Sequence, residues 1–312
     1  MKLPRRTHNW REKYGIGLDV GCASIKGVAI THQGKVLARV ALPTQDTGST
    51  RWRLNIRRAL EQLQTAVRSE PAWIGLGAPG LPGPERRCID FMPGRLRGIE
   101  GLIWQDFLRA KCGVPVLNDA QAALLGEVWR GAARRARNAL LLTLGTGVGG
   151  AALVDGRLLG GHIGRAGHLG HISLNPHGER DVANTPGSLE GAIGDCTIEG
   201  RSHGRFKTTG ALVAAARAGD SEARRLWLES VRALAAGLVS LINVLDPEVV
   251  VLGGGIAKAG PALFRPLGRF LSEFEWRPGG ARVMVRPARL GDWAGAFGAA
   301  WNSMKSNCLE IK

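Results

Sequence analysis

Residues 139–161 read ALLLTLGTGVGGAALVDGRLLGG, and the pattern of this stretch decides the fold class. One apolar run ends in a glycine-rich turn, a second apolar run follows, and Asp155-Gly156 marks another turn. Short apolar runs separated by glycine turns predict β-strands joined as hairpins. Residues 14–30, YGIGLDVGCASIKGVAI, repeat this plan near the start of the chain, where Gly34 suits a further hairpin turn.

Both stretches lead into alternating helices and strands. The patterns predict a helix in 49–70, a strand and turn in 72–83, a strand in 114–118 with a helix starting just after Asp119, a helix capped by Asp220 or Ser221 and ending at 245, a strand and turn in 249–255, and a last helix in 291–304. Alternation of this kind in two similar halves predicts an α/β protein of two lobes with a central cleft.

The composition is typical of a soluble globular protein, with 44% hydrophobic and 22% charged residues over 312 positions. About thirteen polar, basic residues precede the first strand and lack the apolar core of a signal peptide, and no apolar run approaches membrane-spanning length. The five cysteines are scattered without a CxxC pair, which indicates reduced thiols. We therefore expect a cytoplasmic protein with no membrane partner.

The formal net charge of +16 comes mainly from arginine. It fits either attraction to a polyanion, such as nucleic acid or polyphosphate, or an arginine-rich surface without a binding role. Because the arginines are spread along the chain without a compact DNA-reading module, the second interpretation is favoured. Nucleic acid is not an expected partner.

Two kinds of motif carry chemistry. Glycine-rich turns in 19–27, 144–150 and 252–260 would let the backbone approach a ligand and aim its N–H groups at a phosphate chain. Asn118-Asp119 stands between an apolar strand and a helix, where α/β proteins place functional groups. Asp119 could accept the proton of a substrate hydroxyl, or it could simply cap its helix.

These segments resemble the ROK family, which comprises bacterial sugar kinases and sugar-responsive repressors on the two-lobed actin-like ATPase (ribonuclease H-like) fold. The resemblance runs from about Gly15 to about Trp301. It rests on DVGCASIKG (19–27), GAPGLPG (77–83), LNDA (117–120), LGTGVGGAALVDGRLLGG (144–161), GRAGHLGH (164–171) and LDPEVVVLGGG (245–255).

The resemblance implies transfer of the ATP γ-phosphoryl group to a hexose-type hydroxyl, with ATP and Mg²⁺ as cofactors and Asp119 as the base. It assigns sugar contacts to Gly80, Asn118, His168, His171 and Glu190. It assigns the nucleotide and its phosphates to Asp19, Gly21, Lys26, Gly145, Thr146, Gly147, Gly254 and Gly255, and it assigns no metal ligand. A homodimer is expected, with a small lobe of 14–118 plus the helix 295–312 and a large lobe of 119–294.

The sugar loop departs from the family pattern. His168 stands where the family has a glutamate, and His171 matches a histidine that in many members binds zinc with three cysteines. Asp181, Ala183 and Ser188 occupy the cysteine positions, so a cysteine-type zinc site is lost. A site rebuilt from His162, His168, His171 and Asp181 stays an alternative. Ala23 also replaces a threonine in the first phosphate loop, and Gly94 replaces an asparagine.

Three functions fit these observations. The main prediction is an ATP-dependent sugar kinase whose preferred acceptor differs from glucose or binds more weakly. The alternatives are a polyphosphate-dependent sugar kinase and a catalytically weak sugar or nucleotide sensor. A repressor of the usual plan is not expected, because a winged-helix domain needs more residues before the first phosphate loop. The acceptor stays open among glucose, N-acetylated hexosamines, allose, fructose and polyols.

Overall fold

The computed structural model describes residues 13–309, which divide into two compact units. Unit 1 extends to Arg130 and includes the segment from Trp293 onward, and unit 2 is Gly131–Asp292. The basic segment before Lys13 and the end of the predicted 295–312 helix lie outside the described residues.

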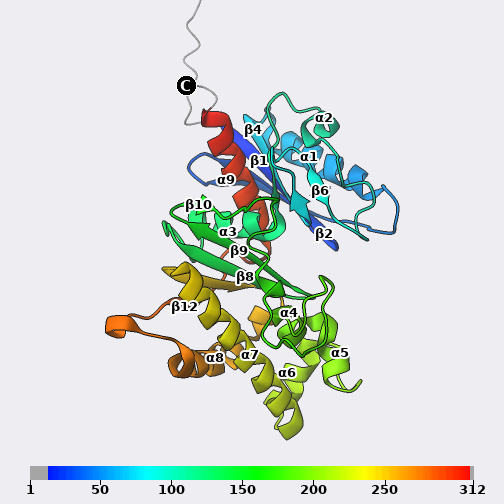
Figure 1. Cartoon of the computed structure of the whole chain (residues 1–312). Helices are drawn as coiled ribbons and strands as arrows, with labels where there is room; N and C mark the ends of the chain where they lie inside the picture. The colour runs from blue at the N-terminus through cyan, green and yellow to red at the C-terminus, as the bar shows by residue number, and fades with distance from the viewer. Residues whose placement is uncertain (1–12, 310–312) are drawn as a thin grey trace, which may run out of the picture. The chain divides into compact units, whose positions relative to one another are not determined.

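Unit 1 is built on a five-stranded sheet in the order β3-β2-β1-β4-β7 (Figure 1). Its strands are β1 (Tyr14–Val20), β2 (Ser24–Thr31), β3 (Val36–Pro43), β4 (Trp73–Ala78) and β7 (Val116–Asn118). The first three are antiparallel, whereas β1, β4 and β7 are parallel. Gly34, with φ +83°, forms the predicted turn between β2 and β3. A small hairpin of β5 (Leu81–Pro82) and β6 (Ile89–Phe91) and the helix α2 (Trp104–Leu108) lie between β4 and β7 in the chain.

Helices α1 (Trp52–Val67) and α9 (Ala294–Leu309) cover opposite faces of this sheet. A Cβ atom at Gly27 would lie 2.8 Å from the Leu63 side chain of α1, whereas one at Gly17 would lie 1.9 Å from the Ala296 carbonyl oxygen of α9. Gly27 pairs with Leu18, and successive residues of a strand point to opposite faces. Glycine on the α9 side therefore lets that helix lie directly on the strands.

Helix α3 (Asp119–Arg130) belongs to unit 1, whereas the predicted lobe boundary fell before it. Its close packing against α9 explains this grouping. A Cβ atom at Gly298 would lie 1.7 Å from the Ala122 carbonyl oxygen, and one at Gly126 would lie 2.2 Å from the Ala294 carbonyl oxygen. Glycine at both positions brings the two helix backbones together.

Unit 2 repeats the topology of unit 1 with the order β10-β9-β8-β11-β12. Its strands are β8 (Ala139–Leu144), β9 (Val148–Val154), β10 (Arg157–Leu158), β11 (Val249–Gly253) and β12 (Met284–Pro287). Its helices are α4 (Leu189–Ile193), α5 (Ile198–Arg201), α6 (Thr209–Arg217), α7 (Ser221–Leu245) and α8 (Pro261–Phe274). As in unit 1, an antiparallel hairpin pair continues into parallel strands, so the predicted repeat of the two halves is confirmed.

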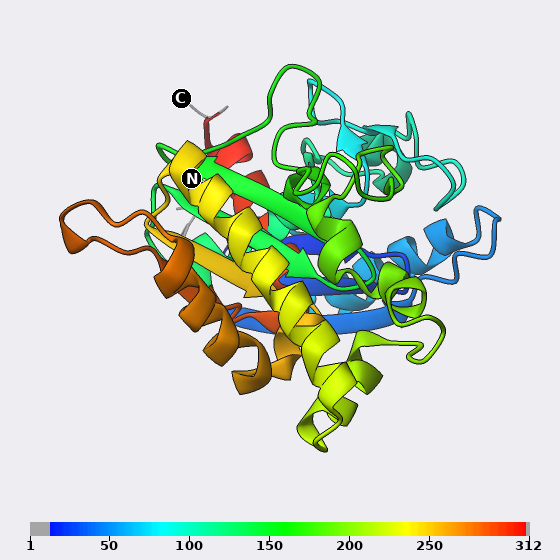
Figure 2. The same ribbon diagram turned by 60° about the horizontal axis from the view of Figure 1, so that its bottom comes forward.

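The 25-residue helix α7 is long and apolar enough to cross a membrane by length and composition alone. Its inner face, with Trp227, Leu234 and Leu238, is instead buried in the core of unit 2. Figure 2 shows α7 running across the sheet with α8 beside it. The Asp220 side chain caps the helix by accepting a hydrogen bond from the Ala223 N–H at 2.9 Å, as predicted. The burial pattern is that of a core helix.

Candidate active site

The carboxyl ends of three parallel strands meet at one edge of the unit 1 sheet. Asp19 near the end of β1 pairs with Gly77 of β4, and Ala78 of β4 pairs with Asn118 at the end of β7. Open α/β sheets bind ligands at this edge. Asp119 follows as the first residue of α3, so the sheet register brings the predicted base and Asn118 to the same edge as Asp19.

Asn118 and Asp119 are held by short hydrogen bonds. The Ala120 N–H donates to Asp119 Oδ1 at 2.8 Å and to Asn118 Oδ1 at 3.0 Å. The Asn118 amide nitrogen donates to the Gly80 carbonyl oxygen at 3.0 Å, which joins two predicted sugar contacts. Gly80 has φ +101°, and a Cβ atom there would lie 2.6 Å from the Phe91 carbonyl oxygen. The Asp119 carboxylate thus accepts from the N–H of the adjacent Ala120, and the interpretation of Asp119 as a helix cap stays a prediction.

Asp19 is an unusual carboxylate. Burial, with the nearby Asp119 charge adding to it, raises the pKa of Asp19 to about 7, although the opposite charge of Lys26 lowers it. Lys26 lies directly across from Asp19 in the β1–β2 register. A Cβ atom at Gly295 would lie 2.4 Å from Asp19 Oδ2, so the start of α9 closes over the carboxylate. Two carboxylates that repel each other at one edge are suited to a divalent cation.

The loop between β1 and β2 is the predicted first phosphate loop. The Gly21 N–H donates to the Ser24 carbonyl oxygen at 3.0 Å, which closes the turn. Thr44, which is fully buried, holds the loop from outside. Its hydroxyl donates to the Gly21 carbonyl oxygen at 2.5 Å, and its N–H donates to the Ala23 carbonyl oxygen at 3.0 Å. Sequence reasoning missed Thr44, because a lone threonine after a strand carries no motif.

In unit 2, the turn between β8 and β9 is the predicted second phosphate hairpin. The Gly145 N–H donates to the Gly147 carbonyl oxygen at 3.0 Å, and the Cys196 N–H donates to the Thr146 carbonyl oxygen at 2.8 Å. Glu190 is buried against the same turn, where its Oε2 accepts the Val148 N–H at 2.8 Å. A Cβ atom at Gly147 would lie 2.3 Å from this oxygen, so glycine is needed there. Glu190, predicted as a sugar contact, therefore supports the hairpin.

A cavity of about 570 Å³ opens beside this hairpin and includes the predicted nucleotide residues Gly145, Thr146 and Gly255. Gly254, the residue before Gly255, has φ +85°, and a Cβ atom there would lie 2.3 Å from the Leu144 carbonyl oxygen. The cavity also has lining residues that sequence reasoning missed, among them Asp195, Thr209, Arg217 and Lys258.

The two cations of this cavity are anchored. Arg217 donates to the Ala259 carbonyl oxygen at 2.6 Å, and the Lys258 ammonium lies 3.4 Å from Asp292. Thr209 is 2% exposed, and its hydroxyl has no hydrogen-bond partner among the described residues. The cavity wall therefore contains a buried polar group that a ligand could satisfy. No sequence motif marks these positions, because they come from separate segments: Thr209 and Arg217 are the two ends of α6, whereas Lys258 lies in the 3₁₀ helix Ile256–Ala259.

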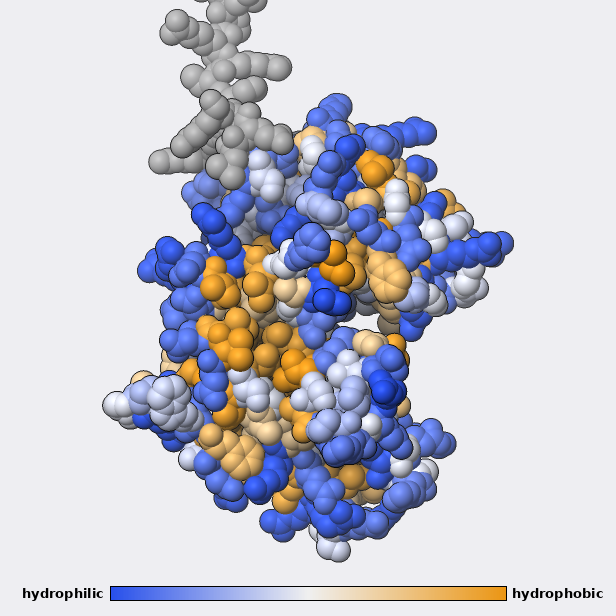
Figure 3. Space-filling view, viewed as in Figure 1, coloured by the Kyte–Doolittle hydropathy of each residue, from blue (hydrophilic) through white to orange (hydrophobic). Residues whose placement is uncertain are grey.

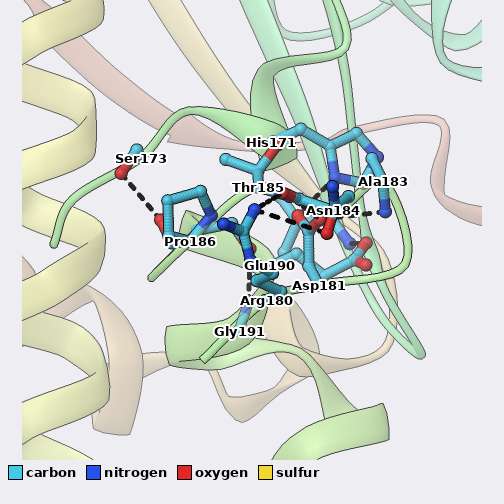
Figure 4. A network of polar contacts seen from close by, with 12 residues as sticks. His171, Ser173, Arg180, Asp181, Ala183, Asn184, Thr185, Pro186, Glu190 and Gly191 are labelled. Atoms are coloured by element: carbon cyan, nitrogen blue, oxygen red, sulfur yellow. Dashed lines mark hydrogen bonds and ion pairs between the residues drawn. The ribbon is translucent and has the colours of Figure 1, made fainter. Parts of the chain in front are cut away.

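The loop that carries His171 is organised by a carboxylate. His171 Nδ1 lies 2.7 Å from Asp181 Oδ2, and the N–H groups of Ala183 and Thr185 donate to Asp181 Oδ1 at 2.9 Å (Figure 4). Burial acts to raise the pKa of Asp181, but the hydrogen bonds from His171, Thr185 and Ser188 outweigh it and hold the pKa below its usual value. The Asp181 carboxylate thus joins His171 to residues 183–185, and Asp181 is one of the three positions at which the sequence resemblance implies a cysteine.

The side chains of His171, Asp181 and Glu190 are of types that bind metal ions and lie close together. The ligand atoms of His171, Asp181 and Glu190 lie within 4.8 Å of one another. Each already contacts protein, however, and structural zinc sites are normally closed by four ligands. In the described part of the chain, this group does not include His162 or His168, so the four-residue alternative is not assembled.

His168 lies half-buried just before the short 3₁₀ helix Leu169–His171. Its Nδ1 is 3.0 Å from the Arg165 carbonyl oxygen. A carbonyl only accepts, so Nδ1 carries the proton and Nε2 is the acceptor nitrogen of the neutral ring. Where the family has a glutamate, this chain therefore presents one acceptor nitrogen in place of two carboxylate oxygens.

The family model "ROK family" matches residues 15–305. The chain belongs to the ROK family. It is 31% identical to a glucokinase of Halalkalibacterium halodurans over 320 residues, covering 93% of this chain and 94% of that protein. The predicted family membership is confirmed.

Solved structures agree. A ROK hexokinase from Thermus thermophilus matches with a TM-score of 0.82 and 32% identity, covering 96% of this chain and 100% of that one. A ROK glucokinase from Streptomyces griseus, solved in complex with glucose and AMPPNP, matches with a TM-score of 0.76 and 26% identity, covering 94% and 99%. The predicted actin-like fold class is confirmed by these relatives.

Proposed function

We propose that this chain is an ATP-dependent sugar kinase, a phosphotransferase that uses a hydroxyl of a hexose-type molecule as acceptor. The glucokinase relatives and the glucose and AMPPNP complex of one of them support this reaction class. The observation that carries the proposal in this chain is the placement of Asp119 beside Asn118 at the carboxyl edge of the unit 1 sheet.

Asp119 acts as the general base. Its carboxylate takes the proton of the acceptor hydroxyl while that oxygen forms its bond to the γ-phosphorus and the bond to the ADP oxygen breaks. Asn118 and Gly80, joined by their hydrogen bond, orient the sugar hydroxyls beside the base. Positioning of this kind supplies much of the catalysis in phosphoryl transfer, because the reaction needs little covalent help from the protein.

The nucleotide is held by unit 2. The glycine turn at 145–147 offers a backbone close enough to contact phosphate oxygens, and the Thr146 hydroxyl is a further donor. The cavity next to this turn takes the adenosine part, with Gly254 and Gly255 allowing close approach. Arg217 and Lys258 add positive charge at the same cavity.

Mg²⁺ fits the charges of the unit 1 edge. Asp19 is a buried carboxylate whose raised pKa reports an unfavourable negative charge, and hard oxygen ligands are those that Mg²⁺ prefers. When bound, the ion neutralises charge on the transferred phosphate. Asp19 would hold the ion and Lys26 would balance the carboxylate when the ion is absent.

The acceptor site differs from that of a glucose-specific relative. His168 offers a single acceptor nitrogen, and His171 is held by Asp181. We expect either a different hexose or polyol, or weaker binding of glucose, because a carboxylate accepts two hydroxyl bonds where an imidazole accepts one.

A homodimer and a cytoplasmic location complete the proposal. Figure 3 shows hydrophobic side chains gathered on one face of unit 2. Val244 in α7, Trp276 after α8 and Met284 in β12 are large hydrophobic residues of this unit with 78%, 73% and 48% of their surface exposed. Exposed apolar surface of this kind favours association with a second copy.

The experiment that tests the function is a screen of hexoses, N-acetylated hexosamines and polyols with ATP or polyphosphate, with sugar phosphate detected directly. We expect phosphorylation of at least one acceptor with ATP and Mg²⁺, unchanged by added zinc. Turnover with polyphosphate alone would replace ATP as the donor. Binding of sugar and nucleotide without product from any donor would instead support the sensor alternative.

A further inference from the structure

A second cavity, of about 430 Å³, lies within unit 1 and belongs to no part of the site above. Pro115 lines it and immediately precedes β7, so the cavity lies at the amino end of that strand. Asn118 is the last residue of the same strand, and Asp119 follows it. The two sites are therefore separated by the length of β7.

Arg86 is the distinctive side chain of this cavity. It is half-buried, and no hydrogen bond or ion pair in the described part of the chain engages its guanidinium. The neighbouring Glu85 is directed to Arg87, with a nitrogen–oxygen distance of 3.7 Å. Burial lowers the pKa of Arg86 with no carboxylate to oppose the effect. A partly desolvated guanidinium without an acidic partner is a recognition group for an oxyanion.

The backbone, not a side-chain partner, fixes Arg86 in place. Its φ is +54°, a left-handed conformation that is uncommon outside glycine. The Arg86 N–H donates to the Gly83 carbonyl oxygen at 2.8 Å, and the Arg86 carbonyl oxygen accepts the Val116 N–H at 2.7 Å. Contacts on both sides of Arg86 therefore hold its backbone in a conformation that costs free energy and fix where its side chain starts.

The lining also includes the charged Glu85 and Arg87, which pair with each other, and several neutral polar groups. Gln105 of α2 and Asn302 of α9 face the same cavity, and an amide both donates to and accepts from a hydroxyl. Arg86 supplies the contact that suits a phosphate or carboxylate, in bidentate geometry. We propose that this cavity binds a small hydroxylated organic anion, with Arg86 on its phosphate or carboxylate group and Gln105 and Asn302 on its hydroxyls.

The test is isothermal titration calorimetry of the full chain with 6-phosphogluconate, which carries both anionic groups on a hydroxylated carbon chain. Gluconate and inorganic phosphate are titrated in parallel, so that the anionic group that is recognised can be identified. The variant Arg86→Met keeps the apolar stem and removes the charge. Arg109→Met is the matched control, because Arg109 also has a left-handed φ, +52°, and does not line the cavity.

We expect 6-phosphogluconate to bind the wild type, and Arg86→Met to weaken binding at least about tenfold, while Arg109→Met leaves it unchanged. If Arg86→Met does not fold, Asn302→Asp serves instead, since it places a carboxylate against the anion and should weaken binding similarly. Absence of binding by all three probes at roughly 10 mM would overturn the proposal. So would binding that neither Arg86→Met nor Asn302→Asp weakens.

Discussion

At the scale of single residues, the ionised Asp19 carboxylate at the carboxyl edge of the unit 1 sheet lowers the free energy of unfolding. Its carboxylate is buried next to Asp119, and both the burial and the second charge oppose ionisation. A raised pKa in the folded state means that folding is favoured by this group below the ordinary carboxyl pKa. The contribution is lost as pH rises through about 7, the folded value.

Replacing Asp19 with Asn should therefore stabilise the protein in the absence of nucleotide and metal while it impairs turnover. The gain in unfolding free energy should grow between about pH 4 and 7, should reach on the order of 2–4 kcal/mol at pH 8, and should vanish below about pH 4. Urea unfolding at several pH values measures it. Asp106→Asn, at an exposed site, is the control and should show no such dependence. A pH-independent difference for Asp19→Asn would contradict this account.

Residue-scale prediction from the sequence was uneven. Asp119, Asn118 and the glycine turns could be proposed as site residues from the sequence, because each combines a residue type with a strand end or a hairpin, and their roles stay predictions. Thr44 and Arg217 could not be proposed, since their roles depend on contacts between segments far apart in the sequence. The assignment of Glu190 to the sugar stays a prediction, and the sequence did not indicate that its carboxylate also accepts a hydrogen bond from the Val148 N–H of the phosphate hairpin.

At the scale of elements, the loop before α4 relies on Asp181. The Asp181 side chain is only 3% exposed and accepts from His171, Ala183 and Thr185, so one carboxylate fixes several turns of the loop. Removing one partner of a buried hydrogen bond leaves the others unsatisfied.

Asp181→Asn should lower the free energy of unfolding by about 1–3 kcal/mol at pH 7. Because the folded pKa is depressed, this stabilisation is present above the ordinary carboxyl pKa and is lost as pH falls below about 4. Thermal unfolding at pH 7 and at about pH 2–3 measures both parts, with the exposed Glu179→Gln in the same loop as control. Equal stability of Asp181→Asn and wild type at pH 7 would show that the loop is held in another way.

Two helix glycines allow the effect of close helix packing on stability to be distinguished from the effect of helix propensity. Gly298 of α9 faces the backbone of α3, whereas Gly268 of α8 has open space where a Cβ would lie. Gly268→Ala should stabilise by about 0.5–1 kcal/mol through helix propensity. Gly298→Ala should destabilise by about 1–3 kcal/mol, because the new methyl group forces the helices apart. Chemical denaturation of both variants decides this. A stabilising Gly298→Ala would refute the close packing of α3 and α9.

At the scale of the whole molecule, the sequence predicted the architecture well because it is a repeat. Two hairpins with glycine turns, each followed by alternating strands and helices, become two sheets with the same strand order. The place of α3 was harder to predict. Its grouping with unit 1 depends on glycine-mediated contact with a helix that begins 164 residues after α3 ends (294 − 130).

The central claim is that Asp119 removes the proton of the acceptor hydroxyl. The most direct measurement is the kcat of Asp119→Asn on the best acceptor found, together with the affinities for sugar and ATP measured by calorimetry. Asp106→Asn is the matched control, because Asp106 also lies in the first turn of a helix. We predict that Asp119→Asn loses about 100- to 10,000-fold in kcat while both affinities stay within severalfold of wild type. Near-normal kcat in Asp119→Asn would contradict the account.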